Sequence, residues 1–150
     1  MEDNIVLSKE NIDLTRLINI LNKAEYNLLN QKFRALNISH VQALIIIYLF
    51  NNDKETFQKD LEKEFGVSTP TMTQSIKSMT KKELIKKDRS KKDKRYYALL
   101  LTDKGKMLYP KCMAIYTEIE SLLDSAFSKS EKANFIKSMK KLINIVQNYN

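Results

Sequence analysis

Residues 67–85 read VSTPTMTQSIKSMTKKELI, and apolar side chains recur in this stretch at the spacing of a helix. Three of them stand at i, i+4 and i+7, on one helical face: Met72, Ile76 and Met79. Ser68 or Thr69 can accept a hydrogen bond from a free N–H at the start of such a helix. Pro70 fits the first turn, where its missing N–H costs nothing. The stretch predicts a short amphipathic helix.

The segment before it predicts another short helix that ends at a glycine. Three apolar side chains recur on its inner side: Phe57, Leu61 and Phe65. Thr56 is the predicted N-cap, and Gly66 readily supplies the positive φ of a sharp turn at a helix end. Helix, glycine turn and helix form a helix-turn-helix pattern, in which the N-terminal part of the second helix faces the base edges of DNA.

The outward face of the second helix suits a groove of DNA. It carries short hydrogen-bonding side chains and cations, with no acid before Glu83. The DNA contacts predicted here are Ser68, Thr69, Thr71, Thr73, Gln74 and Lys77. Taken alone, the same composition also fits an ordinary surface helix with a polar exterior.

A basic hairpin follows directly. Residues 84–87 and 95–101 predict two strands, and the loop 87–94 between them is strongly charged. The cations predicted to contact DNA are Arg89, Lys91, Lys92, Lys94 and Arg95. Most basic loops are merely solvated, but only a polyanion would stabilise like charges gathered this closely. Beside a polar helix of the helix-turn-helix type, the hairpin is interpreted as a wing.

Asp93 is the acid of this basic loop. It stands two residues before Arg95, a spacing that places both side chains on one face of an extended chain. We expect Asp93 to hold the Arg95 guanidinium in one orientation through charge-assisted hydrogen bonds. Asp93 would thus support the DNA site without touching DNA.

The rest of the chain is predicted to be helical, because its 150 residues include only two glycines and two prolines. Long amphipathic helices are expected over residues 9–36, from Thr102 and Asp103 onward, and from about Ser130 to the end. A buried helix capped by Ser39 is expected over residues 40–51. The fold class is therefore mainly α with a small β-hairpin wing, in one domain over residues 1–150.

The composition of the chain narrows the range of possible functions. With 26 Lys and Arg against 18 Asp and Glu, the formal charge of +8 favours nucleic acid or an acidic membrane surface as partner. The longest apolar run, 43–50, is too short for a membrane span, and no signal peptide is seen, so a soluble, cytoplasmic protein is expected. One cysteine, Cys112, and one histidine, His40, predict no disulfide, metal, cofactor or catalytic triad. An enzyme is not expected, and Cys112 is interpreted as a buried, inert thiol rather than a redox sensor.

Two motifs of the chain carry a family resemblance. The wing contains Asp93-Lys94-Arg95, then YYALL, then Leu-Thr-Asp-Lys-Gly ending at Gly105, and residues 57–87 contain a matching recognition core. In these motifs the chain resembles the MarR-type winged-helix transcriptional regulators. It departs from them at Gln74, where many members carry arginine, and at Glu83, where glycine is common.

The resemblance implies a homodimer held by the helices of residues 9–36 and 102–150, around a winged helix-turn-helix part of residues 39–101. It also implies a repressor that reads a palindromic operator in double-stranded DNA. Two alternatives are a ligand-responsive sensor that releases DNA, and an architectural module that binds nucleic acid without reading sequence. Family members often bind small aromatic effectors, for which a cleft could be lined by Tyr26, Phe33, Tyr48, Tyr109 and Tyr116. Aromatic residues at helical spacing are also common in cores, and the terminal helices could instead pack within one chain.

Overall fold

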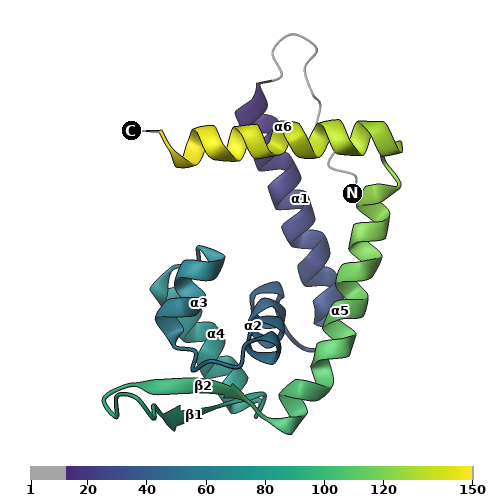
Figure 1. Ribbon diagram of the computed structural model, residues 1–150. Helices are drawn as coiled ribbons and strands as arrows, with labels where there is room; N and C mark the ends of the chain where they lie inside the picture. The colour runs from purple at the N-terminus through teal and green to yellow at the C-terminus, as the bar shows by residue number, and fades with distance from the viewer. Residues whose placement is uncertain (1–12, 150) are drawn as a thin grey trace. The chain divides into compact units, whose positions relative to one another are not determined.

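The computed structural model describes residues 13–149, which form six helices and one two-stranded antiparallel sheet (Figure 1). The elements are α1 (Leu14–Arg34), α2 (His40–Asn51), α3 (Gln58–Phe65), α4 (Thr69–Lys81), β1 (Ile85–Arg89), β2 (Tyr97–Leu101), α5 (Asp103–Asp124) and α6 (Lys129–Gln147). The predicted fold class, mainly α with a β-hairpin, is confirmed. The chain divides within α5: the described residues up to Cys112 form one compact unit, and those from Met113 onward form a second.

Helix α2 is the centre of the first unit and contacts α1, α4 and β2. Ser39 caps it as predicted, since its hydroxyl accepts the Gln42 N–H while the Gln42 side chain accepts the Ser39 N–H. Its apolar residues face protein on several sides, so Ala43 and Ile45 are completely buried. The fully buried Phe33 extends this core to α1.

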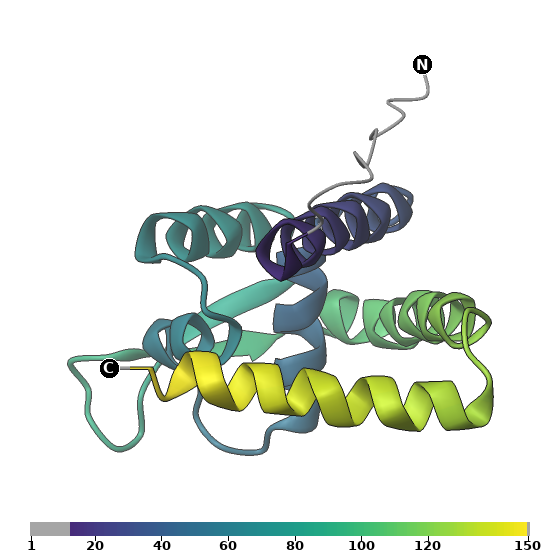
Figure 2. The ribbon, with the colours of Figure 1, turned by 90° about the horizontal axis from the view of Figure 1, so that it is seen from above.

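The turn between α3 and α4 forms as the sequence predicts. Gly66 adopts φ +60° at the end of α3, a left-handed conformation that a residue with a Cβ adopts only at a cost. Helix α4 begins after Ser68, whose hydroxyl accepts the Thr71 N–H. The inner face of α4 is buried as predicted, and it consists of Met72, Ile76 and Met79. Figures 1 and 2 show α3 and α4 as neighbouring helices, as their contacts require.

The prediction of Thr56 as N-cap of α3 is wrong. The helix begins one residue later, with Phe57 at the cap position, and the Asp60 carboxylate accepts the Phe57 N–H at 2.8 Å. Thr56 is buried, and its hydroxyl is engaged inside the loop by Asn52 and by the Lys54 carbonyl. Its own carbonyl accepts the Leu99 N–H at 2.8 Å, which ties the loop before α3 to β2.

The hairpin pairs Ile85 with Leu101 at its base and Arg89 with Tyr97 at its outer end. These strands begin and end up to two residues away from the predicted ones, so Arg89 ends a strand and Arg95 lies in the turn. The Ser90 N–H donates to the Tyr96 carbonyl at 2.9 Å and thereby closes the turn. In Figures 1 and 2 the loop between the strands projects at the edge of the first unit.

The base of the hairpin is joined to the start of α5. Glu83 has φ +59°, a left-handed conformation that glycine adopts more easily, and it stands where the family resemblance leads us to expect glycine. The Thr102 hydroxyl donates to the Glu83 carbonyl at 2.6 Å and accepts the Gly105 N–H at 3.1 Å. A Cβ at Gly105 would collide with the Leu84 carbonyl oxygen. These contacts give a physical reason for the Leu-Thr-x-x-Gly motif.

The second unit consists of the later part of α5 and all of α6. The Ser128 hydroxyl accepts the Glu131 N–H, while the Glu131 carboxylate accepts the Ser128 N–H at 2.7 Å, so α6 begins with a complete capping box. Phe127 stacks on Phe135 with 5.1 Å between the ring centroids. No residue of α6 is buried, although the helix is rich in apolar side chains.

Candidate nucleic-acid interface

Helix α4 presents its predicted contact residues to solvent. Thr71, Thr73, Gln74 and Lys77 are all exposed, while the apolar residues between them are buried. Ser68 and Thr69 are exposed at the N-terminal end of the same helix. The structure therefore gathers the six predicted residues of the turn and the helix on one accessible, polar surface.

Two residues of α3 join this surface, and sequence reasoning missed them. The Gln58 amide nitrogen donates to Glu62 Oε1 and to Thr73 Oγ1, both at 2.8 Å. The Thr69 hydroxyl donates to Glu62 Oε2 at 3.0 Å. The i, i+4 spacing of Gln58 and Glu62 is visible in the sequence, but their bonds to α4 depend on how the two helices pack.

The five predicted cations of the wing are all exposed. Two of them lie over tyrosine rings of the hairpin. The Arg89 guanidinium is 5.7 Å from the Tyr97 ring centroid, and the Arg95 guanidinium is 5.9 Å from that of Tyr96. Arg89 also donates to the Lys94 carbonyl at 3.4 Å. Both arginines are therefore held by contacts within the hairpin.

Asp93 contacts Arg95 as predicted. Its carboxylate accepts Arg95 Nη2 at 2.7 Å and Nε at 3.0 Å, which is a two-pronged charge-assisted contact. The contact lowers the pKa of Asp93 and raises the pKa of Arg95. The predicted geometry was different, because the two residues lie in a turn rather than in an extended strand. In that turn Asp93 Oδ1 also accepts the Arg95 backbone N–H at 3.0 Å.

Ser90 is the buried centre of the wing turn, with a relative exposure of 2%. Its hydroxyl accepts the backbone N–H groups of Lys92 and Asp93, each at 3.1 Å. It donates its proton to Glu55 Oε2 at 2.9 Å, and Glu55 Oε1 accepts the Lys91 N–H at 2.6 Å. These hydrogen bonds, from the Lys91 backbone first and then from Ser90, lower the pKa of Glu55. Glu55 therefore fastens the wing turn to the loop before α3.

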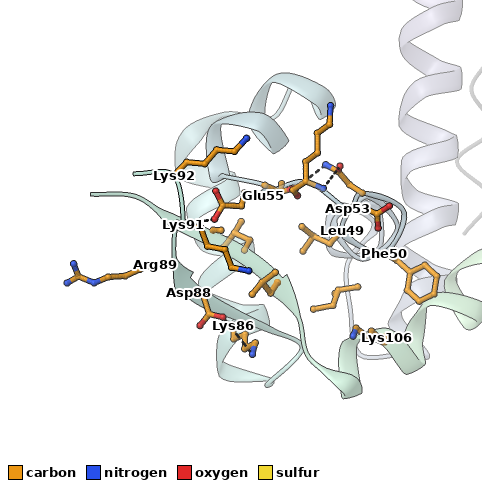
Figure 3. A pocket seen from close by; sticks show the side chains of 17 residues that line it. Leu49, Phe50, Asp53, Glu55, Lys86, Asp88, Arg89, Lys91, Lys92 and Lys106 are labelled. Atoms are coloured by element: carbon orange, nitrogen blue, oxygen red, sulfur yellow. Dashed lines mark hydrogen bonds and ion pairs between the residues drawn. The ribbon is translucent and has the colours of Figure 1, made fainter. Parts of the chain in front are cut away.

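Figure 3 shows this contact at the edge of a pocket of about 1220 Å³. Glu55 points toward the chain at Lys91, and Lys86 and Lys106 lie farther along the rim. Leu49, Leu99 and Leu101 are among the pocket's apolar lining residues. Glu55 lies in the loop before α3, and sequence reasoning did not single it out. The contact with Ser90 spans 35 residues of chain, so no local pattern could reveal it.

The aromatic residues considered for an effector cleft take part in separate contacts. Phe33 and Tyr26 both pack against His40, with centroid distances of 6.2 and 5.9 Å. Tyr48 meets Phe65 edge to face. Tyr109 stacks on Phe50 at 3.8 Å. The fifth member of the set, Tyr116, lies in the second unit. Within the first unit, Phe33 is buried in the core, Tyr48 and Tyr109 are partly exposed, and Tyr26 is about half exposed.

Residues 13–149 contain no group of three side chains able to hold a metal ion, and no helix among them is long and apolar enough to cross a membrane. Cys112 is fully buried, and burial raises its pKa to about 11, so the thiol stays protonated at neutral pH. This agrees with the interpretation of Cys112 as an unreactive packing residue.

Comparison with known proteins identifies the family. Residues 27–111 match the family described as "Transcriptional regulator SarA/Rot". The chain belongs to this family. It is therefore a DNA-binding transcriptional regulator of the winged-helix type, and not an enzyme.

Two relatives of this SarA/Rot-family chain are also named as transcriptional regulators. The HTH-type transcriptional regulator MgrA of Staphylococcus aureus is 26% identical over 114 residues, which are 76% of each chain. The HTH-type transcriptional regulator SarZ of Staphylococcus haemolyticus is 27% identical over 101 residues, or 67% of each chain.

Solved structures confirm the MarR-type resemblance. The transcription regulator MarR from Oenococcus oeni PSU-1 is 30% identical, with a TM-score of 0.71 over 88% of this chain and 99% of that one. MepR of S. aureus in its DNA complex gives a TM-score of 0.82 over 89% of this chain and 98% of that one. At 21% identity, the likeness to MepR shows the shared fold alone.

Proposed function

We propose that this regulator is a sequence-specific repressor that binds a palindromic operator as a homodimer. The observation that carries the proposal is the exposed surface of α4, on which Thr71, Thr73, Gln74 and Lys77 stand together without an acid among them. Such side chains can bond base edges in the major groove, which an α-helix can enter. A bound dimer would then block access to the promoter that contains its operator.

The wing has a different role in this proposal. Lysines on a mobile stem act as point charges on phosphate, and they add affinity without reading sequence. Arg95 is held by Asp93, so its planar guanidinium can enter a narrow minor groove or clamp a phosphate with little loss of rotamer freedom. We therefore assign base reading mainly to α4 and anchoring mainly to the wing.

Exposed apolar side chains support dimerisation. They occur on all three helices proposed to form the dimer: Leu14, Ile18 and Leu21 of α1, Leu122 of α5, and Ile136, Ile143 and Val146 of α6. Apolar surface of this extent commonly marks a protein–protein interface. A dimer with its two α4 helices about 34 Å apart would read two half-sites one helical turn apart. The part of the predicted first helix before Leu14 includes residues 9–12, which lie outside the described residues.

Selection of bound sites from a random DNA pool tests the proposal. We expect an inverted repeat, with specific binding more than about 10³-fold tighter than non-specific binding. Gln74→Ala should relax the preference at one base pair per half-site, by about 1–3 kcal/mol, if its amide bonds an adenine edge. Enrichment of no common sequence would instead favour the architectural alternative. The effector alternative has less support, because the candidate aromatic residues pack in separate places.

A further inference from the structure

An acid stands at the junction of α3 and the proposed reading helix. Glu62 of α3 is only partly exposed and contacts Gln58 and Thr69. A carboxylate near DNA repels phosphate, so Glu62 opposes binding unless its contacts contribute something else. We propose that Glu62 is a positioning residue that fixes which hydroxyl groups of α4 can donate to DNA and which can only accept. This inference rests on the proposed role of α4 in base reading.

The first consequence concerns the hydroxyl proton of Thr69. A carboxylate can only accept hydrogen bonds, so in the 3.0 Å contact with Glu62 Oε2 the Thr69 hydroxyl must be the donor. Its one proton is then used, and only oxygen lone pairs remain. Thr69 can therefore accept from an amino group, such as adenine N6 or cytosine N4, but cannot donate to phosphate while this bond is kept.

The second consequence is that the contact with Glu62 fixes the orientation of the Gln58 side-chain amide. Glu62 Oε1 also accepts only, so Gln58 must present its NH₂ group to it rather than its carbonyl. The second hydrogen of the same nitrogen then donates to Thr73 Oγ1 at 2.8 Å. Glu62 thus determines, through Gln58, that the Thr73 oxygen is an acceptor inside the protein.

The Thr73 hydroxyl consequently keeps its own proton for DNA. Thr73 is exposed, and its hydroxyl can donate outward to guanine N7 or O6, adenine N7 or thymine O4. Two threonines one turn apart on α4 thus present opposite hydrogen-bonding characters, Thr69 as acceptor and Thr73 as donor. A single carboxylate on the neighbouring helix sets both.

The test compares two acid-to-amide variants of α3 in selections from the same random DNA pool. Glu62→Gln removes the acceptor-only group but keeps its shape. Glu64→Gln is the matched control, because Glu64 is exposed on the same helix and makes none of these three bonds. Each variant loses one negative charge, so each should bind all DNA somewhat more tightly. Only Glu62→Gln should also weaken base preference, by about three- to tenfold at one or two base pairs per half-site, the range that one hydrogen bond is worth.

Two further variants test whether the effect of Glu62 on base preference passes through Gln58 and Thr73. Thr73→Val removes the outward donor, and Gln58→Ala removes the link from Glu62 to Thr73. We expect both to relax preference at a base pair that Glu62→Gln also relaxes. Circular dichroism of each variant checks that it folds.

The outcomes separate this inference from the proposed function. If wild type selects an inverted repeat and Thr73→Val changes the preference, while Glu62→Gln gives the same profile as Glu64→Gln, the positioning role is overturned and base reading by α4 stands. A wild-type protein that enriches no common sequence would overturn the proposed function, and this inference with it.

Discussion

Asp93 places a negative charge in the middle of the basic wing surface that is proposed to bind DNA. Its carboxylate holds the Arg95 guanidinium through two side-chain bonds, and it accepts the Arg95 backbone N–H as well. Both side chains are substantially exposed, so the pair adds little to folding stability. We expect the pair to raise DNA affinity instead, because an arginine that is already oriented loses less entropy when it contacts a phosphate or a groove.

Replacing Asp93 tests this expectation directly. If only net charge matters, Asp93→Ala should raise DNA affinity, whereas a positioning role predicts lower affinity, by about three- to tenfold. Asp88→Ala is the matched control, since Asp88 lies on the same hairpin and its 3.8 Å contact with Lys86 is looser. Titration of both variants against one operator at fixed salt gives the answer. Tighter binding by Asp93→Ala, as for the control, would refute the positioning role.

The hairpin and α5 meet where a glycine allows close packing. Gly105 lies against the Leu84 carbonyl, which also accepts the Thr102 N–H at 3.1 Å. Gly105→Ala should therefore lower the free energy of unfolding by at least about 2 kcal/mol, because backbone rather than a flexible side chain must move. Gly66→Ala should cost only about 1 kcal/mol, since its sole penalty is the positive φ and no atom lies within 4 Å. Urea denaturation measures both, and equal losses would contradict this account of Gly105.

The loop before α3 and the wing turn are joined through Glu55. Glu55→Ala should weaken operator binding by about three- to tenfold, because the turn that carries Lys91 and Lys92 loses two hydrogen bonds. Asp53→Ala is the control: Asp53 is exposed in the same loop and carries the same charge. If both variants bind more tightly, the contact with Glu55 does not order the wing.

The same contact predicts a dependence of stability on pH. Because its hydrogen bonds lower the pKa of Glu55 from 4.5, the stabilisation is fully present above pH 4.5 and is lost as pH falls through the lower folded value. The difference in unfolding free energy between wild type and Glu55→Ala should shrink accordingly in acid. Urea titrations at several pH values measure it.

Elements defined by local signals were predictable from the sequence. The caps Ser39 and Ser68 and the turn at Gly66 form as expected, because each depends on residues only a few positions apart. The failure at Thr56 has the opposite cause, since tertiary contacts with β2 place that residue inside the loop. Contacts across long stretches of chain, such as Glu55 with Ser90, were likewise beyond local patterns. The exposure of the α4 and wing residues and the contact of Asp93 with Arg95 were predicted, but the contacts of Glu55 and Glu62 were not.

At the scale of the whole molecule, the positive charge favours binding to DNA, and the exposed apolar surface is proposed to hold the dimer together. The formal charge of +8 draws the protein to any DNA, and this attraction weakens steeply with salt. Sequence reading needs more contacts than one short helix supplies, and in the proposed dimer a second copy of the chain would provide them. The apolar residues exposed on the terminal helices are the surface proposed to hold that copy.

Helix α6 offers the clearest test of the dimer. Ile136 and Ile143 stand two turns apart on one face and have relative exposures of 43% and 49%. Replacing both by Glu should split a dimer that buries them, because two like charges on each copy would lose water at the interface. Operator affinity should then fall about a hundredfold or more, since each half-site would be bound independently.

The matched control places the same two charges on the opposite face of α6. Asn134 and Ser138 are exposed, and each lies roughly half a turn around the helix from Ile136. Asn134→Glu with Ser138→Glu should leave both assembly and DNA binding nearly unchanged. Sedimentation gives the mass of each variant, and circular dichroism confirms its fold. A folded Ile136→Glu, Ile143→Glu protein that still sediments as a dimer would exclude this face of α6 as the interface. A folded monomer with full operator affinity would show that dimerisation is not needed for operator reading.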